Sequence, residues 1–207
     1  MADRRALSEA ERAKVRDAVA AAEAATTGEI FVVVAAMSDD YRFIPLLWAT
    51  LIALVVPLPL VLVTTFGAAT IFAAQLVSFI LLALVLSWPA MRPQVVPGRV
   101  KHGRAHALAV QQFLAHGLQM TEARTGALIF VSLAERHAEI VADAGIAAQV
   151  GQAEWDAVIA ALTGEIRRGR LAEGLVAAVA GVGVILARHF PASPGDRNEL
   201  PNEIVLL

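Results

Sequence analysis

The fold of this chain is decided by residues 43–91, FIPLLWATLIALVVPLPLVLVTTFGAATIFAAQLVSFILLALVLSWPAM, which contain no charged residue and no histidine. A helix needs about 20 apolar residues to cross the hydrocarbon core of a bilayer, so this stretch is long enough for two. The natural break is the segment 64–68, TTFGA, which places the spans near Ile44–Val63 and Ile71–Trp88. The sequence therefore predicts a two-pass transmembrane helical hairpin.

Pro57 and Pro59 lie inside the first expected span. Each removes a backbone donor and is expected to kink the helix. The alternative is a re-entrant first span that does not cross, but a lipid-exposed break in the backbone is disfavoured. Residues 174–187 are also uncharged. That run suits a buried core helix better than a membrane span, because it is too short to cross a bilayer.

Flanking cations predict the orientation of the hairpin. Arg42 precedes it, no charge lies in its turn, and four cations follow it: Arg92, Arg99, Lys101 and Arg104. The positive-inside rule then places both ends in the cytoplasm, and these four cations become candidate membrane-surface residues. No secretory signal is expected, because the first apolar run starts only after Tyr41. We expect a multi-pass protein of a bacterial cytoplasmic (inner) membrane, with both termini and the soluble domain in the cytoplasm.

The remaining sequence reads as one small α/β domain that the hairpin interrupts. A helix with a capping box is expected from Ser8 to about Ala25, and a buried strand from Glu29 to Ala35. A second buried strand, Ala127–Leu133, opens with a similar Thr-Gly pair, so the two strands are expected to pair in parallel through a crossover. The expected later elements are a third, antiparallel edge strand at 138–142 and helices at 99–118, 153–168 and 170–189.

The expected organisation is an α/β/α sandwich split in sequence but whole in space. Its parts are residues 1–42 (helix and strand), 43–91 (hairpin), 92–190 (helix, two strands, two helices) and a disordered tail at 191–207.

Composition excludes several classes of protein. The 207 residues carry a net charge of −2 and include no cysteine. A protein that binds nucleic acid normally has a strongly basic surface, so no nucleic acid is expected as a partner. The lack of cysteine excludes a disulfide framework, a Cys-ligated zinc site and a thiol nucleophile.

Four short pieces of the sequence resemble the TPM-domain family, which includes thylakoid acid-phosphatase-like and photosystem-repair proteins and membrane-bound bacterial relatives. The pieces are AEAATTGEI (22–30), RTGALIFV (124–131), EIVADAGI (139–146) and RGRLAEGL (168–175), in the family's order. The resemblance implies an α/β/α sandwich and, by analogy, a hydrolase-like domain.

The sequence departs from the family pattern at two places. Many relatives carry an acidic residue and Asn before the second strand, where this chain has Arg124-Thr125. Many also carry Asp after the third strand's glycine-rich segment, where this chain reads AAQVG at 147–151. If those acids bind metal in relatives, this chain lacks them. Relatives also commonly place the domain outside the cytoplasm, whereas this one is expected to face inward.

Asp143 is the leading candidate for a catalytic residue, because it ends a strand beside Gly145. The alternative role is a turn or helix-capping carboxylate. Glu139 lies four residues earlier, so it shares a face with Asp143 if the strand continues, and Glu135 does so only if the turn allows it. Asp143 and Glu139 are the candidate ligands for a divalent cation, and no other cofactor is expected.

Other polar residues are weaker candidates. His102 and His106 share a helix face and could ligate zinc, but neighbouring cations favour a basic helix near lipid headgroups. His137 is expected to be a solvated turn residue. No phosphate-binding loop or nucleophile elbow is present, and Ser38 and Ser132 are not adjacent to any predicted base.

Three functions remain open from the sequence. The favoured one is a membrane-anchored, non-catalytic binding, assembly or maintenance module, with the lipid bilayer and other membrane proteins as partners. The alternative is a metal-assisted phosphatase-type hydrolase, which rests on family analogy. The third is a sensor of the lipid surface that uses the basic segment 92–104.

Overall fold

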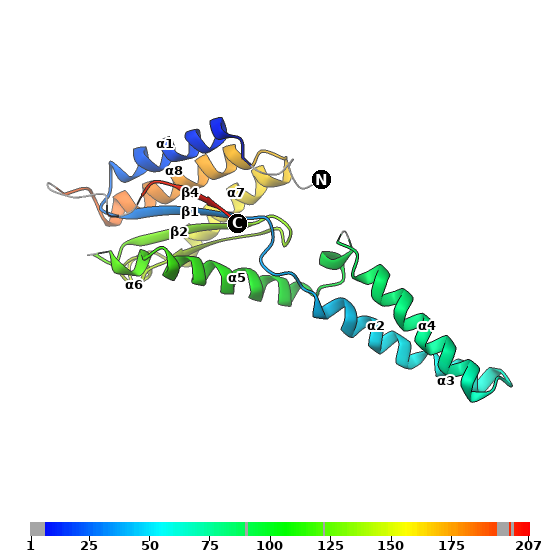
Figure 1. Cartoon of the computed structure of the whole chain (residues 1–207). Coiled ribbons are helices and arrows are strands. Elements are labelled where there is room, and N and C mark those ends of the chain that lie inside the picture. Colours follow the sequence, from blue (N-terminus) through cyan, green and yellow to red (C-terminus); the bar gives the residue numbers. More distant parts are fainter. Residues whose placement is uncertain (1–6, 90, 122, 194–198, 200) are drawn as a thin grey trace. The chain divides into compact units, whose positions relative to one another are not determined.

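The structure is a computed structural model that describes residues 7–89, 91–121, 123–193, 199 and 201–207. These residues form two compact units (Figure 1). One unit joins the described residues of 1–38 to those of 103–207, and the other contains those of 39–102. The first unit is therefore assembled from two separate segments of the chain.

The first unit contains a four-stranded sheet in the order β3-β2-β1-β4. Strand β1 (Glu29–Ala35) pairs in parallel with β2 (Gly126–Ser132), and β3 (His137–Ala142) pairs antiparallel with β2 at the edge. These pairings confirm the predictions for the three strands. Every residue of β1 and β2 is buried, because helices cover both faces of the sheet, and this explains why the two strands read as unbroken apolar runs.

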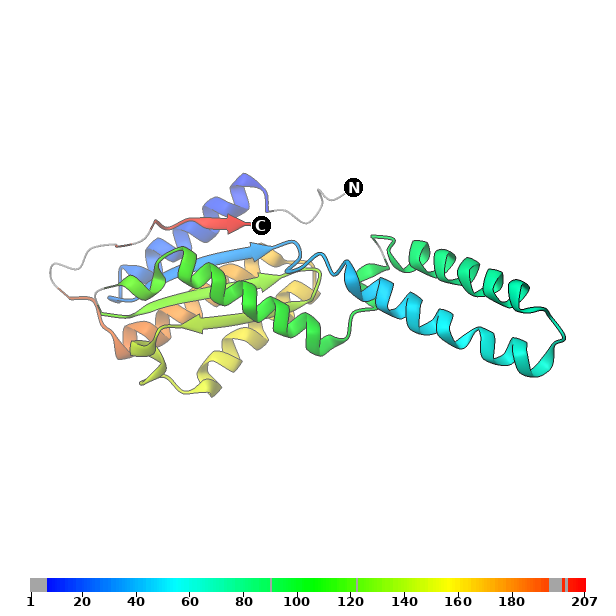
Figure 2. The same ribbon diagram turned by 60° about the horizontal axis from the view of Figure 1, so that its bottom comes forward.

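Helices cover the two faces of the sheet unequally (Figures 1 and 2). Helices α1 (Glu9–Glu23), α7 (Gln152–Arg167) and α8 (Leu171–His189) pack on one face, against side chains such as Val32. Helix α5 (Gly98–Ala115) packs on the other face, against side chains such as Phe31. Alternate residues of each strand thus contribute to two separate cores, and the mixed α/β fold is a three-layered one.

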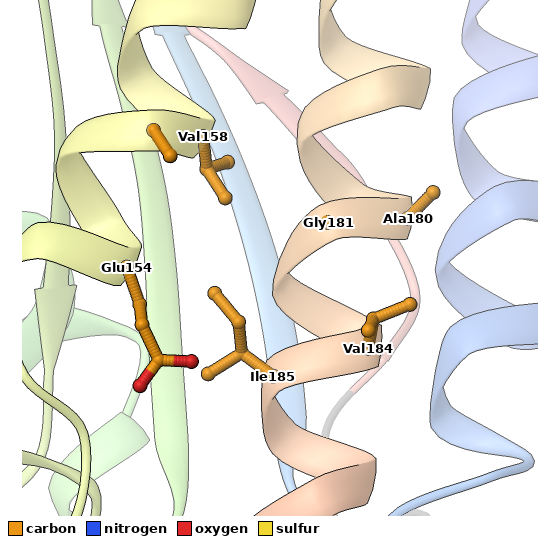
Figure 3. Close-up of a pocket in the computed structure, with 7 residues that line it drawn as sticks. Glu154, Val158, Ala180, Gly181, Val184 and Ile185 are labelled. Atoms are coloured by element: carbon orange, nitrogen blue, oxygen red, sulfur yellow. The ribbon is translucent and has the colours of Figure 1, made fainter.

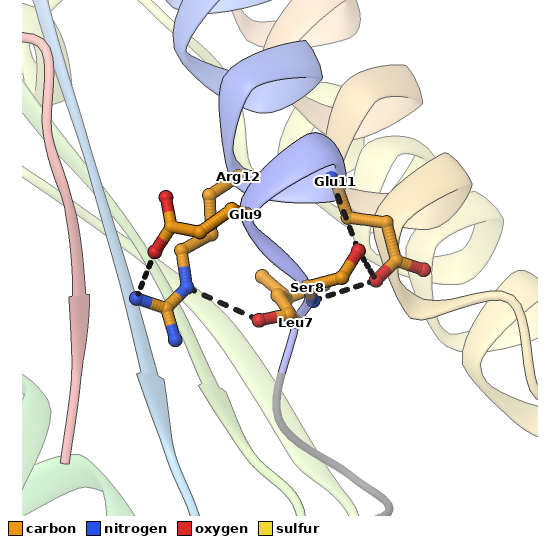
Figure 4. A network of polar contacts seen from close by, with 5 residues as sticks. All are labelled: Leu7, Ser8, Glu9, Glu11 and Arg12. Carbon is orange, nitrogen blue, oxygen red and sulfur yellow. Dashed lines mark hydrogen bonds and ion pairs between the residues drawn. The ribbon is translucent and has the colours of Figure 1, made fainter.

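Helix α1 begins with the predicted capping box (Figure 4). The Ser8 hydroxyl accepts a hydrogen bond from the Glu11 backbone N–H at 3.3 Å, and the Glu11 carboxylate accepts one from the Ser8 N–H at 2.7 Å. These bonds satisfy two of the free N–H groups at the helix start. Arg12 bonds Glu9 and the Leu7 carbonyl on the same turn.

The prediction of a disordered tail at 191–207 is wrong for strand β4 (Ile204–Leu206), which pairs in parallel with β1. Ile204 and Leu206 pack on one core and Val205 on the other. A three-residue strand is too short to show periodicity, and its partner β1 lies far away in the sequence, so the pattern gave no signal. Residues 194–198 and 200 of the expected tail lie outside the described residues.

The second unit contains an apolar helical hairpin. Its first arm consists of α2 (Phe43–Val55) and α3 (Pro57–Val63), and its second arm is α4 (Ala68–Leu86). The first arm is interrupted at Val56, immediately before Pro57, which confirms the predicted proline effect. The prolines at 57 and 59 both lie within the first turn of α3, where a missing N–H costs least.

Three helical stretches among the described residues are long and apolar enough to cross a membrane, judged by length and composition: Phe43–Val63, Ala68–Leu86 and Leu171–His189. They differ in burial. The buried share is 11% and 0% for the two arms of the hairpin but 50% for Leu171–His189. Helix α8 packs its apolar side chains against the sheet, and Leu175, Val179 and Val182 are inaccessible to solvent. This burial agrees with the prediction of a core helix.

Candidate functional site

Two buried acids, Glu29 and Asp143, lie in one row of the sheet. Glu29 is the register partner of Gly126, whose carbonyl accepts a hydrogen bond from the Asp143 N–H at 2.9 Å. The row marks the edge where β1 and β2 begin and β3 ends. The backbones of the two acids are separated by the width of β2 and its two pairings, about 10 Å.

Packing above Gly126 keeps the two acids apart. An added Cβ at Gly126 would lie 2.5 Å from the Leu118 carbonyl oxygen, in the short helix η2 (Leu118–Met120). Backbone therefore fills the space over the middle of the row. Because cation ligands must all approach one point to within about 2.0–2.6 Å, Glu29 and Asp143 do not form a shared ion site.

Asp143 acts as the N-cap of the short helix α6 (Ala144–Ala147). Its Oδ1 accepts a hydrogen bond from the Ala144 N–H at 2.6 Å. Its Oδ2 is buried and makes no hydrogen bond within the described part of the chain. The next glycine, Gly145, packs closely on backbone, since an added Cβ there would lie 2.5 Å from the Arg124 carbonyl oxygen. The capping role is thus established by geometry, and Oδ2 is the atom left for any chemistry.

Glu139 does not join Asp143. The two residues are four positions apart along an extended chain, a separation of about 13 Å. The Glu139 carboxylate instead lies between two imidazoles, with Oε2 at 2.9 Å from His106 Nδ1 and Oε1 at 3.4 Å from His137 Nε2. Burial acts most strongly on the pKa of Glu139 and raises it, but the hydrogen bonds and charges of His137 and His106 outweigh burial and leave the pKa lowered.

The position of His137 corrects the sequence analysis. It is the first residue of β3, and its side chain is only 20% exposed, so it is not a solvated turn residue. His106 projects from α5 and contacts Glu139. From the sequence, His106 had been considered only together with His102.

Two further carboxylates, Glu23 and Glu29, lie close together where α1 ends and β1 begins. The Glu23 Oε1 accepts a hydrogen bond from the Ile30 N–H at 2.9 Å, and the Glu29 Oε1 accepts one from the Glu199 N–H at 2.9 Å. Burial raises the pKa of Glu23 to about 7. The hydrogen bond from the Ile30 N–H lowers the pKa, the nearby Glu29 charge raises it, and the hydrogen bond with Asn202 lowers it. This pair was not predicted from the sequence, although Glu29 opens an otherwise apolar strand.

A hydroxyl–carboxylate chain lies at the opposite edge, where β1 and β2 end. The Ser38 hydroxyl donates to the Ser132 hydroxyl at 2.8 Å, and Ser132 donates to Glu135 Oε2. The Ser38 N–H donates to Glu135 Oε1 at 3.0 Å. From the sequence these serines were expected to lie beside no predicted base, but Glu135 contacts both of them. Ser132 is fully buried, so its hydroxyl does not face solvent, and these hydrogen bonds join the two strand ends.

An apolar groove lies between α7 and α8 (Figure 3). Glu154 is its polar lining residue, and the Glu154 carboxylate is already paired with Arg188 at 3.0 Å. The other lining residues are aliphatic or glycine: Ala157, Val158, Ala180, Gly181, Val184 and Ile185. The groove therefore offers contact area without reactive groups.

Within the part of the chain that the structure describes, no group of three or more His, Asp or Glu side chains is arranged to hold a metal ion. Asp143 and Glu139, the sequence candidates for a cation, are thus held by separate neighbours.

The model of the TPM domain matches residues 95–185. The second part of the α/β domain is thus similar to the TPM domain. A solved structure of similar fold is the NMR structure of BA42 protein from the psychrophilic bacterium Bizionia argentinensis, with a TM-score of 0.63 and 21% identity over 97% of this chain and 95% of that one. No curated protein matches the chain.

Within the segment that matches the TPM domain, Thr125 has a structural role at the position where the sequence resemblance led us to expect an acid and Asn in many relatives. The Thr125 hydroxyl donates to the Thr27 carbonyl at 3.0 Å, and the Thr125 N–H donates to the Thr121 hydroxyl at 3.1 Å. These bonds tie the starts of β1 and β2 together. This position therefore holds a threonine that links the two strands, in place of a carboxylate.

The four cations expected at the membrane surface have different structural surroundings. Arg92, in the short helix η1 (Arg92–Gln94), donates through Nε and an NH2 group to the Ser87 carbonyl at 3.1 and 2.9 Å. It therefore caps the end of α4. Arg99, Lys101 and Arg104 lie on the first two turns of α5.

Proposed function

We propose that this protein is anchored in a bacterial cytoplasmic membrane by its apolar hairpin and that its α/β domain binds other membrane proteins. The observation that carries the proposal is the exposed apolar surface of the hairpin. Large hydrophobic side chains are exposed along both arms, among them Leu54, Leu62, Phe72, Leu81 and Leu84, each with more than half of its surface accessible. A soluble protein rarely exposes an apolar patch of this extent.

The internal packing of the hairpin also suits a bilayer. Ala49 and Ala53 are buried within the hairpin, and small residues let apolar helices approach closely in lipid. At the end of the first arm, the N–H and the hydroxyl of Thr64 both bond the Leu60 carbonyl, at 3.1 and 2.6 Å. The Leu60 carbonyl thus has two donors from within the protein, which suits an environment without water.

The cytoplasmic location is supported by charge asymmetry. Arg42 and Arg92 flank the hairpin, while its turn, residues 64–67, carries no charge. The positive-inside rule places the two cationic ends in the cytoplasm and the turn outside.

Single cysteines test the anchoring directly, because the natural sequence has none. In intact cells, Thr65→Cys in the turn is expected to react with a membrane-impermeant maleimide. Ser193→Cys, in the α/β domain, is expected to react only after the membrane is permeabilised. Reaction at both sites in intact cells would overturn the cytoplasmic placement, and extraction of the protein by alkaline carbonate would overturn membrane insertion.

A hydrolase remains the second candidate function because the buried Oδ2 of Asp143 has no hydrogen bond within the described residues. Phosphate-ester hydrolysis by the detergent-purified protein, with and without Mg²⁺ or Ca²⁺, separates the two functions. Asp143→Asn retains a capping oxygen, so it should preserve α6. Metal-stimulated hydrolysis that is lost in Asp143→Asn supports the hydrolase. Equal background in both supports the binding module, as does co-purification of a defined membrane protein without a metal effect.

A further inference from the structure

The outer edge of β1, which faces away from β2, is closed by two different groups. At its start the Glu23 carboxylate accepts the Ile30 N–H at 2.9 Å. At its end the Leu207 N–H donates to the Val34 carbonyl at 3.0 Å, and the Ala36 N–H donates to the Leu207 carbonyl at 2.7 Å. A side chain thus replaces a strand over the first part of this edge, and only the second part holds an added strand.

The segment seated on that second part is short and aliphatic. Strand β4 pairs Ile204, Val205 and Leu206 with Val32, Val33 and Val34. Its three side chains alternate between the two cores and are only half-buried. The site therefore accepts an extended run of consecutive aliphatic residues parallel to β1. The carboxylate of Glu23 limits this run to about four residues, since the Ile30 N–H is already satisfied.

Strand β4 is also weakly held by its surroundings. Its other edge pairs with no described strand, because the sheet order ends at β4. Elements with few buried contacts and exposed backbone hydrogen bonds open most readily from a native structure. The β1 edge beneath it is better formed, since all seven residues of β1 are buried.

We propose that the outer edge of β1 is a strand-addition site for an extended aliphatic segment of a partner protein, and that residues 204–207 keep it closed until such a segment displaces them. Main-chain hydrogen bonds give affinity in this mode of binding, and the two core faces select the side chains. A second copy of this chain offers the identical segment at a lower effective concentration than the tethered one. The edge therefore favours a different segment that fills both faces more completely.

This inference rests on the proposed role as a binding module and names the surface that the partner uses. Its test does not depend on the hairpin, because the probe is a soluble peptide. A failure of membrane insertion would refute the anchoring and leave the peptide result unchanged.

The test compares the full-length detergent-purified protein with Leu206→Asp, which places a charge against the apolar core and is expected to release β4. The probe is a fluorescent peptide of residues 199–207, ELPNEIVLL. We expect Leu206→Asp to bind it at least tenfold more tightly than the parent, because the parent's site is already occupied. Glu203→Ala, at an exposed position before β4, is the matched control and should bind like the parent. A peptide carrying the Leu206→Asp change should not bind.

Hydrogen exchange at Ala36 reports the site itself. Its amide is expected to exchange faster in Leu206→Asp than in the parent and to regain protection when the peptide saturates. Val205→Pro is a second opening variant, because proline cannot donate in a strand ladder. Should both variants keep β2 protected yet fail to bind the peptide, the proposal is overturned. It is equally overturned if the parent forms dimers that disappear in Leu206→Asp, because the occupant is then a second copy.

Discussion

The raised pKa of Glu23 predicts that stability falls as pH rises through the neutral range. Its pKa is about 7 in the folded chain, against 4.5 for the unperturbed group. A carboxyl whose pKa is raised by folding contributes no penalty below about pH 4.5. The folded state loses stability progressively between pH 4.5 and 7, because the unfolded state gives up the proton first. Above pH 7 the loss is constant.

The size of the effect follows from the pKa values. The change from 4.5 to about 7 corresponds to about 3.4 kcal/mol at 1.36 kcal/mol per pKa unit. The Glu23 side chain keeps some solvent contact, so screening leaves an expected cost of roughly 1–2 kcal/mol. Glu23→Gln removes the charge but keeps an oxygen for the Ile30 N–H. We therefore expect Glu23→Gln to be more stable than the parent by that amount at pH 8 and about equal to it at pH 4.5.

Urea unfolding from pH 4.5 to 8 measures this difference. Fluorescence of Trp155, which is buried beside the sheet, reports the α/β domain when Trp48 and Trp88 of the hairpin are replaced by Phe. Glu203→Gln, at an exposed acid of the same C-terminal segment, is the control and should follow the parent. Glu29→Gln should lower the pKa of Glu23 by removing a neighbouring negative charge. The reasoning fails if Glu23→Gln shifts stability by the same amount at every pH or if it destabilises the domain at pH 8.

Three further substitutions have expected effects on the free energy of unfolding. Glu139→Gln removes a carboxylate whose pKa is lowered, so it should lower the free energy of unfolding by roughly 0.5–1 kcal/mol at pH 6. The difference between the variant and the parent should vanish as pH falls below about 4.5, and denaturant titrations at several pH values check this. Gly145→Ala forces a Cβ to within 2.5 Å of the Arg124 carbonyl oxygen and should cost about 1–3 kcal/mol in thermal unfolding, whereas Gly103→Ala, with open space around it, should not destabilise α5. Ser132→Ala removes a buried donor to Glu135 and should cost about 1–3 kcal/mol; a Ser132→Ala variant as stable as the parent would show that the Ser38–Ser132–Glu135 bonds do not hold the strand ends together.

Much of the fold could be predicted from sequence because its decisive segments have strong local patterns. An uncharged run as long as residues 43–91 has few alternatives to an apolar hairpin. Strands β1 and β2 are apolar apart from Glu29 and Ser132 at their ends, because both of their faces are covered. The capping box at Ser8 is a local motif, so the start of α1 could also be located.

The candidate site could be predicted only in part, because its contacts join residues that are distant in sequence. Ser38 bonds Glu135 across 97 positions, and Glu29 bonds Glu199 across 170. No periodic pattern records such pairs. The pairing of Glu139 with His106 and His137 likewise depends on how α5 crosses β3. Asp143 was predicted as either a catalytic or a capping acid, and its bond to the Ala144 N–H establishes the second role.

The insertion of the hairpin between β1 and β2 has a consequence for how the chain is synthesised. Glu29 pairs with Gly126, so β1 leaves the ribosome long before its neighbour exists. At about 5–20 residues per second, the wait is on the order of 5–20 s. During that time a strand that is apolar after Glu29 has unpaired backbone on both edges, and this combination promotes aggregation. Translation arrested just before residue 126 should therefore leave β1 bound to a chaperone or accessible to protease, and the domain should become protected only after β2 and α8 have emerged.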